Sequence, residues 1–129
     1  MRQITTRLKN GEDLKEGIVR IVKENNVKAG VIVSAVGCVS KASLRIADGK
    51  TVKTWDKPFE IVSITGTVSV NGCHIHISLS DTDGMIVGGH VKEGCIINTT
   101  AEIVILNFDD TEYLRSPDAT TGYDELEVK

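Results

Sequence analysis

Residues 72–90 read GCHIHISLSDTDGMIVGGH, and they contain all three histidines of the chain. From residue 73 to residue 80 apolar and polar side chains alternate, which is typical of a β-strand with one face on the core. In such a strand His74 and His76 share the polar face, about 6 to 7 Å apart along the strand. The turn residues DTDG follow, so we expect a hairpin whose second strand carries His90.

The register of this hairpin decides where His90 points. A three-residue loop at 81–83 is followed by a glycine, which suits the left-handed position of such loops. This loop pairs His76 with Gly88 and His74 with His90, and it matches apolar residues with apolar residues on the other face. All three imidazoles then lie on one face, unless a bulge at the glycine pair displaces His90.

Three convergent neutral imidazoles suit a borderline divalent ion such as Zn²⁺, and a site built from histidine alone leaves a fourth position for water or a substrate group. We therefore predict His74, His76 and His90 as metal ligands and Zn²⁺ as the cofactor. Two alternatives stay open: a polar pocket or anion site without metal, and three solvated surface histidines. A neighbouring subunit could also complete the ligand set.

A site that activates water also needs a carboxylate as a base or as a hydrogen-bond partner of the ligands. Glu102 is the candidate catalytic residue, because it interrupts an apolar strand and needs a partner if it is buried. A charge on the exposed face of an edge strand explains it equally well. Glu60 is a second candidate, whereas Asp81 and Asp83 are more typical of turn residues.

The rest of the chain predicts an α+β fold with one principal amphipathic helix. Residues 11–26 carry apolar side chains at helical spacing, with Glu12 and Asp13 suited to the first turn. Residues 28–39 are apolar and β-branched, as in a strand buried on both faces. Further strands are expected at 3–9 and 94–108.

Turn signals organise these strands into a mainly antiparallel meander. Asp48-Gly49 and Asn71-Gly72 are preferred pairs for two-residue hairpin turns. The polar tail from residue 109 to residue 129 is expected to wrap the surface. At 129 residues the chain is predicted to be a single domain, 1–129.

The composition indicates the cellular location of the protein and restricts the classes of partner that it can bind. No apolar stretch is long enough for a membrane span, and the polar N-terminus is unlike a secretory signal, so we expect a cytoplasmic protein without membrane contact. Three cysteines without a CxxC pair agree with a reducing compartment. The 15 Lys and Arg are scattered and outnumbered by 18 Asp and Glu. DNA is a possible partner that the charge does not support, since only an oligomer could gather a basic face.

Two long segments, 11–48 and 58–106, resemble the plants-and-prokaryotes-conserved (PPC) domain. The FEIVSITGT segment, the DxxGxxxGGH run from Asp81 to His90 and the AEIVI strand carry the resemblance. The chain is similar in particular to the stand-alone prokaryotic members, which are often labelled PD1-like DNA-binding proteins. The resemblance implies a compact fold with a mainly antiparallel sheet, few helices and assembly as a homotrimer.

In plant members the PPC domain follows AT-hooks, whose Arg-Gly-Arg-Pro core grips the minor groove, and this sequence contains no such core. We therefore interpret the chain as a homotrimeric PPC-domain protein with a three-histidine zinc site, from a family labelled DNA-binding or regulatory. The alternative is a metal-dependent enzyme or a small-ligand-binding protein, and an assembly module stabilised by metal is a third possibility. A steep loss of binding with salt would indicate DNA contacts, whereas loss of metal on replacing a histidine would indicate the metal site.

Overall fold

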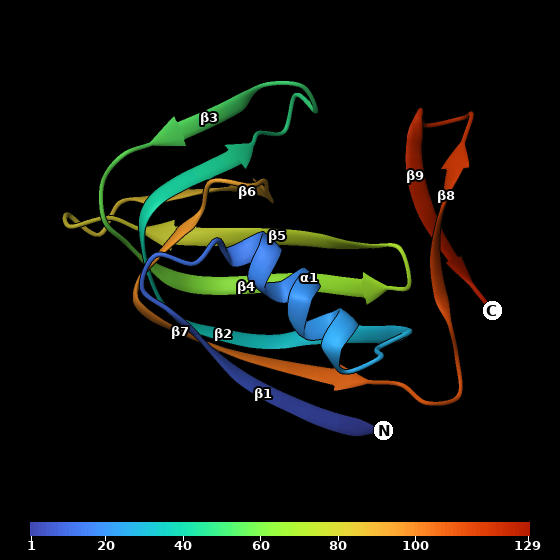
Figure 1. Cartoon of the computed structure of the whole chain (residues 1–129). Helices are drawn as coiled ribbons and strands as arrows, with labels where there is room; N and C mark the ends of the chain where they lie inside the picture. The colour runs from blue at the N-terminus through green and yellow to red at the C-terminus, as the bar shows by residue number, and fades with distance from the viewer.

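The computed structural model describes all 129 residues, which form one helix and nine strands joined by loops (Figure 1). The elements are β1 (Arg2–Lys9), α1 (Leu14–Glu24), β2 (Ala29–Arg45), β3 (Val52–Trp55), β4 (Phe59–Ser69), β5 (Gly72–Ser80), β6 (Ile86–Val91), β7 (Ile96–Asn107), β8 (Tyr113–Asp118) and β9 (Tyr123–Val128). Seven strands form one sheet, and β8 and β9 form a separate hairpin. The helix α1 is neither long nor apolar enough to cross a membrane.

The helix begins and ends close to where the sequence predicts. Asp13 is the N-cap, and its carboxylate accepts hydrogen bonds from the backbone N–H groups of Glu16 at 3.0 Å and Gly94 at 2.6 Å. The second bond ties the start of α1 to the loop before β7. Asn25 is the C-cap, as its position in the sequence suggests.

Every pairing in the sheet is antiparallel, in the order β1-β7-β2-β4-β5-β6, with β3 paired to the end of β2. The predicted α+β class is confirmed, and β4, β5 and β6 form the predicted meander. The last long strand departs from it, because β7 pairs with β1 and β2 rather than following β6. In addition, β6 returns to the end of β2, where Leu44 pairs with Val91 and Arg45 with His90.

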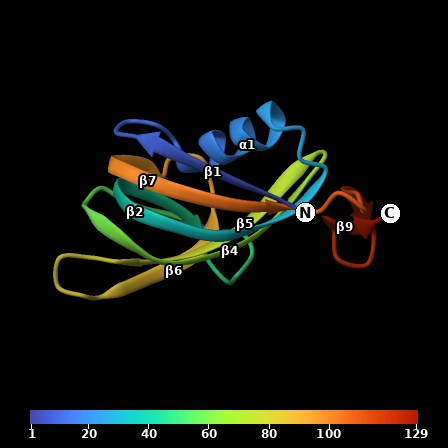
Figure 2. The same ribbon diagram turned by 90° about the horizontal axis from the view of Figure 1, so that it is seen from below.

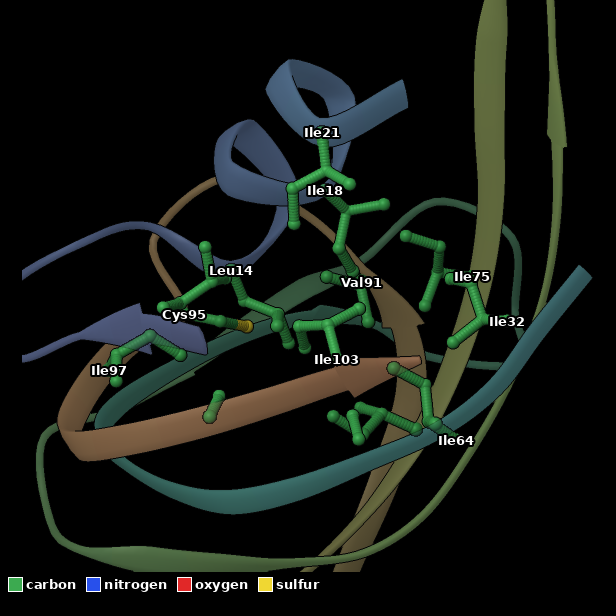
Figure 3. Packing of buried hydrophobic residues seen from close by; sticks show 14 of the residues in the cluster. Leu14, Ile18, Ile21, Ile32, Ile64, Ile75, Val91, Cys95, Ile97 and Ile103 are labelled. Carbon is green, nitrogen blue, oxygen red and sulfur yellow. The ribbon is translucent and has the colours of Figure 1, made fainter. Parts of the chain in front are cut away.

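The core lies between α1 and one face of this curved sheet (Figures 2 and 3). Ile18 and Ile21 point from α1 toward the sheet, where Ile75 and Ile103 are almost fully buried. The opposite face has no helix over it (Figure 2). Within one chain the expectation that β2 is buried on both faces is therefore wrong, since Val36 on that strand is 57% exposed. We call this uncovered side the outer face.

Two hairpin turns differ in detail from the sequence interpretation. Asp48-Gly49 lies in the turn after β2, with Gly49 at φ +73°, but the loop is longer than two residues, because the Ile46 N–H donates to the Thr51 carbonyl at 2.9 Å. The β4–β5 turn consists of Val70 and Asn71, one residue earlier than expected, because Ser69 pairs with Gly72.

The β5–β6 loop spans residues 81–85 instead of 81–83, a five-residue loop that the backbone N–H of Asp81 closes by donating to the Met85 carbonyl at 2.9 Å. The Asp81 carboxylate organises it by accepting from the N–H groups of Asp83 and Met85. The register is consequently shifted by two residues: His90 pairs with His76 rather than with His74, and Gly88 pairs with Ser78. A shift of two preserves the face to which each side chain points.

The tail forms a hairpin rather than a wrapping segment, and it stands beside the sheet (Figure 1). Asn71 fastens β8, since its side chain donates to the Arg115 carbonyl at 2.8 Å and accepts from the Arg115 N–H at 2.7 Å. The Tyr123 hydroxyl fastens β9 by donating to the Gly49 carbonyl at 3.2 Å.

Candidate metal centre

The alternation of β5 places the histidines on the outer face. Ile75, Ile77 and Leu79 are buried in the core, so the side chains between them point outward. Across the sheet, His76 lies between Thr65 of β4 and His90 of β6, and His90 in turn pairs with Arg45 of β2. His74 is the next outward residue along β5. No bulge interrupts the β5–β6 pairing, so the predicted convergence of the three histidines is confirmed.

The three rings form a compact cluster. The Nε2 atoms of His74 and His76 are 3.1 Å apart, and one ligand nitrogen from each of the three rings lies within 4.8 Å of the others. The ring centroids are 4.8 to 5.5 Å apart. Four ligands about 2.0 to 2.1 Å from Zn²⁺ in a tetrahedron are separated by about 3.3 Å. Small side-chain rotations would bring the three nitrogens to that spacing.

The surroundings favour neutral imidazoles. Burial is the largest cause that lowers the pKa of His90 to about 4, and the positive charge of Arg45 is the second. Burial also lowers the pKa of His74, as do His76 and Arg115, while Glu125 opposes the shift. Both rings are therefore neutral at pH 7, which is the form that binds a metal ion.

One ring nitrogen of the cluster lacks a hydrogen-bond partner. His90 Nδ1 is buried and has no hydrogen bond within the chain. A buried polar nitrogen without a partner costs roughly 1–3 kcal/mol. Because a neutral imidazole is also a common metal ligand, the donor set and this unsatisfied nitrogen fit a bound divalent ion.

The carboxylates that the sequence suggests as catalytic candidates do not lie beside the three histidines. Glu102 is exposed on β7, paired with Arg7 and Val36, and the strands β2 and β4 separate it from β5. Within one chain it does not reach the histidines, and neither does Glu60, whose partner is Ser80 at the far end of β5. Asp81 organises the β5–β6 loop and binds Lys57 at 3.0 Å, so it is a turn residue as its sequence context suggests.

A cavity of about 400 Å³ lies next to the cluster, between the sheet and the C-terminal hairpin. His74 and His90 line it from the sheet. Sequence reasoning missed its charged walls, which are Arg45, Arg115, Asp124 and Glu125. The alternation in YLRSPD and YDELEV, with Gly122 between them, was the available signal for a hairpin in the tail.

Comparison with known proteins gives the family. The model of the Plants and Prokaryotes Conserved (PCC) domain, abbreviated PPC above, matches residues 1–109. The chain belongs to this family. The matched PPC residues include β1 to β7 with all three histidines, whereas β8 and β9 lie beyond them. A single PPC domain over 1–129 therefore stays a prediction.

Two solved structures resemble the chain along almost its whole length. A hypothetical protein from Salmonella cholerae-suis superposes with a TM-score of 0.94 and 32% identity, covering 99% of this chain and 93% of its own. A metal-containing protein from Archaeoglobus fulgidus gives a TM-score of 0.84 and 28% identity, covering 98% and 94%. Both support the PPC fold described above.

A curated relative is longer. The chain is 38% identical over 123 residues to "Bifunctional protein GlmU" of a Synechococcus strain, and the match covers 95% of this chain but 20% of that protein. The chain thus spans about a fifth of the length of this relative.

Proposed function

We propose that this PPC-domain protein binds one divalent metal ion per chain, Zn²⁺, through His74, His76 and His90. The observation that carries the proposal is the convergence of three ring nitrogens within 4.8 Å on one sheet face. The similar Archaeoglobus protein is described as metal-containing, which supports the same assignment. Bound Zn²⁺ would act as a Lewis acid toward water or a small ligand at the fourth position.

The chain's own residues prepare this site. The β5–β6 ladder fixes the spacing of His76 and His90, and burial keeps His90 neutral. The strand pairing therefore places the ligands on one face, and side-chain rotations would complete the arrangement around a metal ion. A site on strands is more precise than one on loops.

We further propose that the protein assembles as a homotrimer through the outer face. Val33 and Val36 on β2 and Val62 on β4 are 51%, 57% and 58% exposed. Exposed apolar side chains gathered on neighbouring strands favour a protein contact. Because the histidines share this face, a neighbouring subunit can also bring a further ligand or carboxylate to them, in addition to Asp124 and Glu125 of the adjacent cavity.

The metal content of purified, tag-free protein tests the zinc proposal. We expect about one zinc per chain by plasma mass spectrometry and less than a tenth of that in His74→Ala. Thr65→Ala is the matched control, because Thr65 lies beside His76 on the same face and offers no nitrogen ligand. Protein that carries no metal after incubation with zinc and gel filtration would refute the proposal.

DNA binding is not part of the proposed function. The chain carries 15 basic and 18 acidic residues, a net charge of −3, whereas phosphate contacts require concentrated positive charge. Titration of a DNA duplex over a salt series measures any such contacts in the assembled protein. A steep decrease of affinity with salt would establish them.

A further inference from the structure

The cavity beside the histidines has two walls of different origin. Arg45, His74 and His90 line it from the sheet, and Arg115, Tyr123 and Glu125 line it from the β8–β9 hairpin. The hairpin lies outside residues 1–109, which the family model matches. In Figure 1 it stands beside the sheet near the end of β4 and the start of β5.

Both arginines of the cavity are held in place by uncharged groups. Arg115 donates from Nη2 to Thr67 Oγ1 at 2.7 Å, while its Nε is buried and has no partner. The Arg45 guanidinium lies 5.4 Å from the centre of the Tyr123 ring, a cation–π contact. Neither side chain forms an ion pair within 4.0 Å, although Asp124 and Glu125 line the same cavity.

Arginines fixed in this way are prepared to bind an oxyanion. A guanidinium presents N–H groups in a planar fork that matches a carboxylate with two parallel hydrogen bonds. The unpartnered Nε of Arg115 is one arm of such a fork. Because this Nε is buried, a rotation of the Arg115 side chain would be needed to bring its N–H to an anion in the cavity, which would supply the acceptor that the chain itself lacks.

The charges around the cavity restrict the class of anion. The two guanidinium groups balance the two carboxylates of Asp124 and Glu125, so a divalent ion on neutral histidines leaves an excess of positive charge. An anion is therefore favoured. Asp124 and Glu125 accept hydrogen bonds but repel further negative charge, which favours a ligand with hydroxyl groups and a single carboxylate over the phosphate dianion.

We propose that this cavity binds a small hydroxy carboxylate, with the carboxylate on Arg115 and Arg45 and the hydroxyl groups on Asp124 and Glu125. The inference adds a ligand class to the proposed function. It rests on that function for one additional contact, between a ligand oxygen and the metal. The arginine contacts require no metal. The two ideas can therefore fail independently.

Isothermal titration calorimetry with D-gluconate tests the inference on both zinc-loaded and metal-free protein. We expect binding to native protein, tighter with zinc, and weaker binding of acetate, glycerol and inorganic phosphate. Arg115→Met and Arg45→Met should each lower the gluconate affinity about 10- to 100-fold, as expected for a lost charge-assisted hydrogen bond. Arg20→Met is the control, since Arg20 lies on α1 and pairs with Glu12.

Two further measurements separate loss of the ligand contact from loss of structure. Thermal unfolding and zinc content should be the same for native protein and both arginine variants. Arg115→Lys keeps the charge but removes the fork, so it should recover only part of the affinity.

Each outcome decides between the proposals. Gluconate binding that depends on both arginines, in a protein that takes up no zinc after incubation with it, would support the anion site and refute the metal site. Zinc binding with gluconate affinity unchanged by either arginine variant would refute the anion site alone. Phosphate that binds at least as tightly as gluconate would overturn the hydroxy carboxylate class.

Discussion

His90 lies directly across from His76 in the β5–β6 ladder. The two residues are 14 positions apart in the chain, and the five-residue loop from Asp81 to Met85 decides that they meet. With a three-residue loop, His90 would face His74. In both arrangements the three rings share one face, but in the observed one the other neighbour of His90 is Arg45 of β2.

Gly89 holds β6 against β2, so a side chain there should disturb the cluster. A Cβ at this position would lie 2.6 Å from the Arg45 carbonyl oxygen, closer than real contacts allow. We expect Gly89→Ala to move the strand that carries His90, lower zinc affinity at least tenfold and cost about 1–3 kcal/mol of unfolding free energy. Competition with a chelator and urea denaturation measure the two effects.

Gly11→Ala is the control for this variant. Unlike Gly89, Gly11 has a positive φ, +89°, and nothing lies within 4 Å of its added Cβ. It should lose a comparable amount of stability through backbone strain and retain zinc. Equal zinc affinity in the Gly89→Ala and native proteins would show that the packing of β6 does not position His90.

Val36 and Val62 should hold the subunits together. A charge at either position would be buried unpaired in the proposed interface, so Val36→Asp and Val62→Asp should convert the proposed trimer to monomer. Val128→Asp is the control, because Val128 is 61% exposed but lies on β9. Light scattering after gel filtration measures the mass. Unchanged trimers in both outer-face variants, or a monomeric native protein, would contradict the proposed assembly.

Cys73 should react slowly with alkylating reagents below pH 9. Burial raises the pKa of its thiol to about 11, so the reactive thiolate is a minor species at pH 8 and grows as the pH approaches that value. We expect iodoacetamide to modify Cys73 at pH 8 at least tenfold more slowly than a free thiol of pKa about 8.5. Peptide mass spectrometry over pH 7 to 10 measures the rate. A rate at pH 8 equal to that of the free thiol would contradict the burial of Cys73.

Asp13 should stabilise the fold through two backbone groups. Its carboxylate accepts from Glu16 N–H, as an N-cap does, and from Gly94 N–H in the loop before β7. Asp13→Ala should cost about 1–2 kcal/mol, and Asp13→Asn should cost less because the amide oxygen still accepts. Urea denaturation measures both. Equal losses in the two variants would show that the charge matters rather than the acceptor.

The sequence by itself determined the elements and the side to which their residues point. The period of 3.6 around Leu14 and Ile18 predicts α1, and the alternation from Cys73 to Ser80 places His74 and His76 opposite the core. These features are local, because the backbone geometry of a helix or strand repeats within a few residues. For the same reason an error of two residues in the hairpin loop left the convergence of the histidines intact.

Only the tertiary structure decided which distant segments meet. The pairing of β7 with β1 and β2, the return of β6 to β2 and the exposure of Val36 depend on how the sheet curves around α1. The same holds for Glu102, which the fold carries away from the histidines, and for Arg115, which the Asn71 contacts bring to the cavity. Long-range strand pairings depend on competition among many similar apolar surfaces. The outcome of that competition cannot be predicted from a single stretch of sequence.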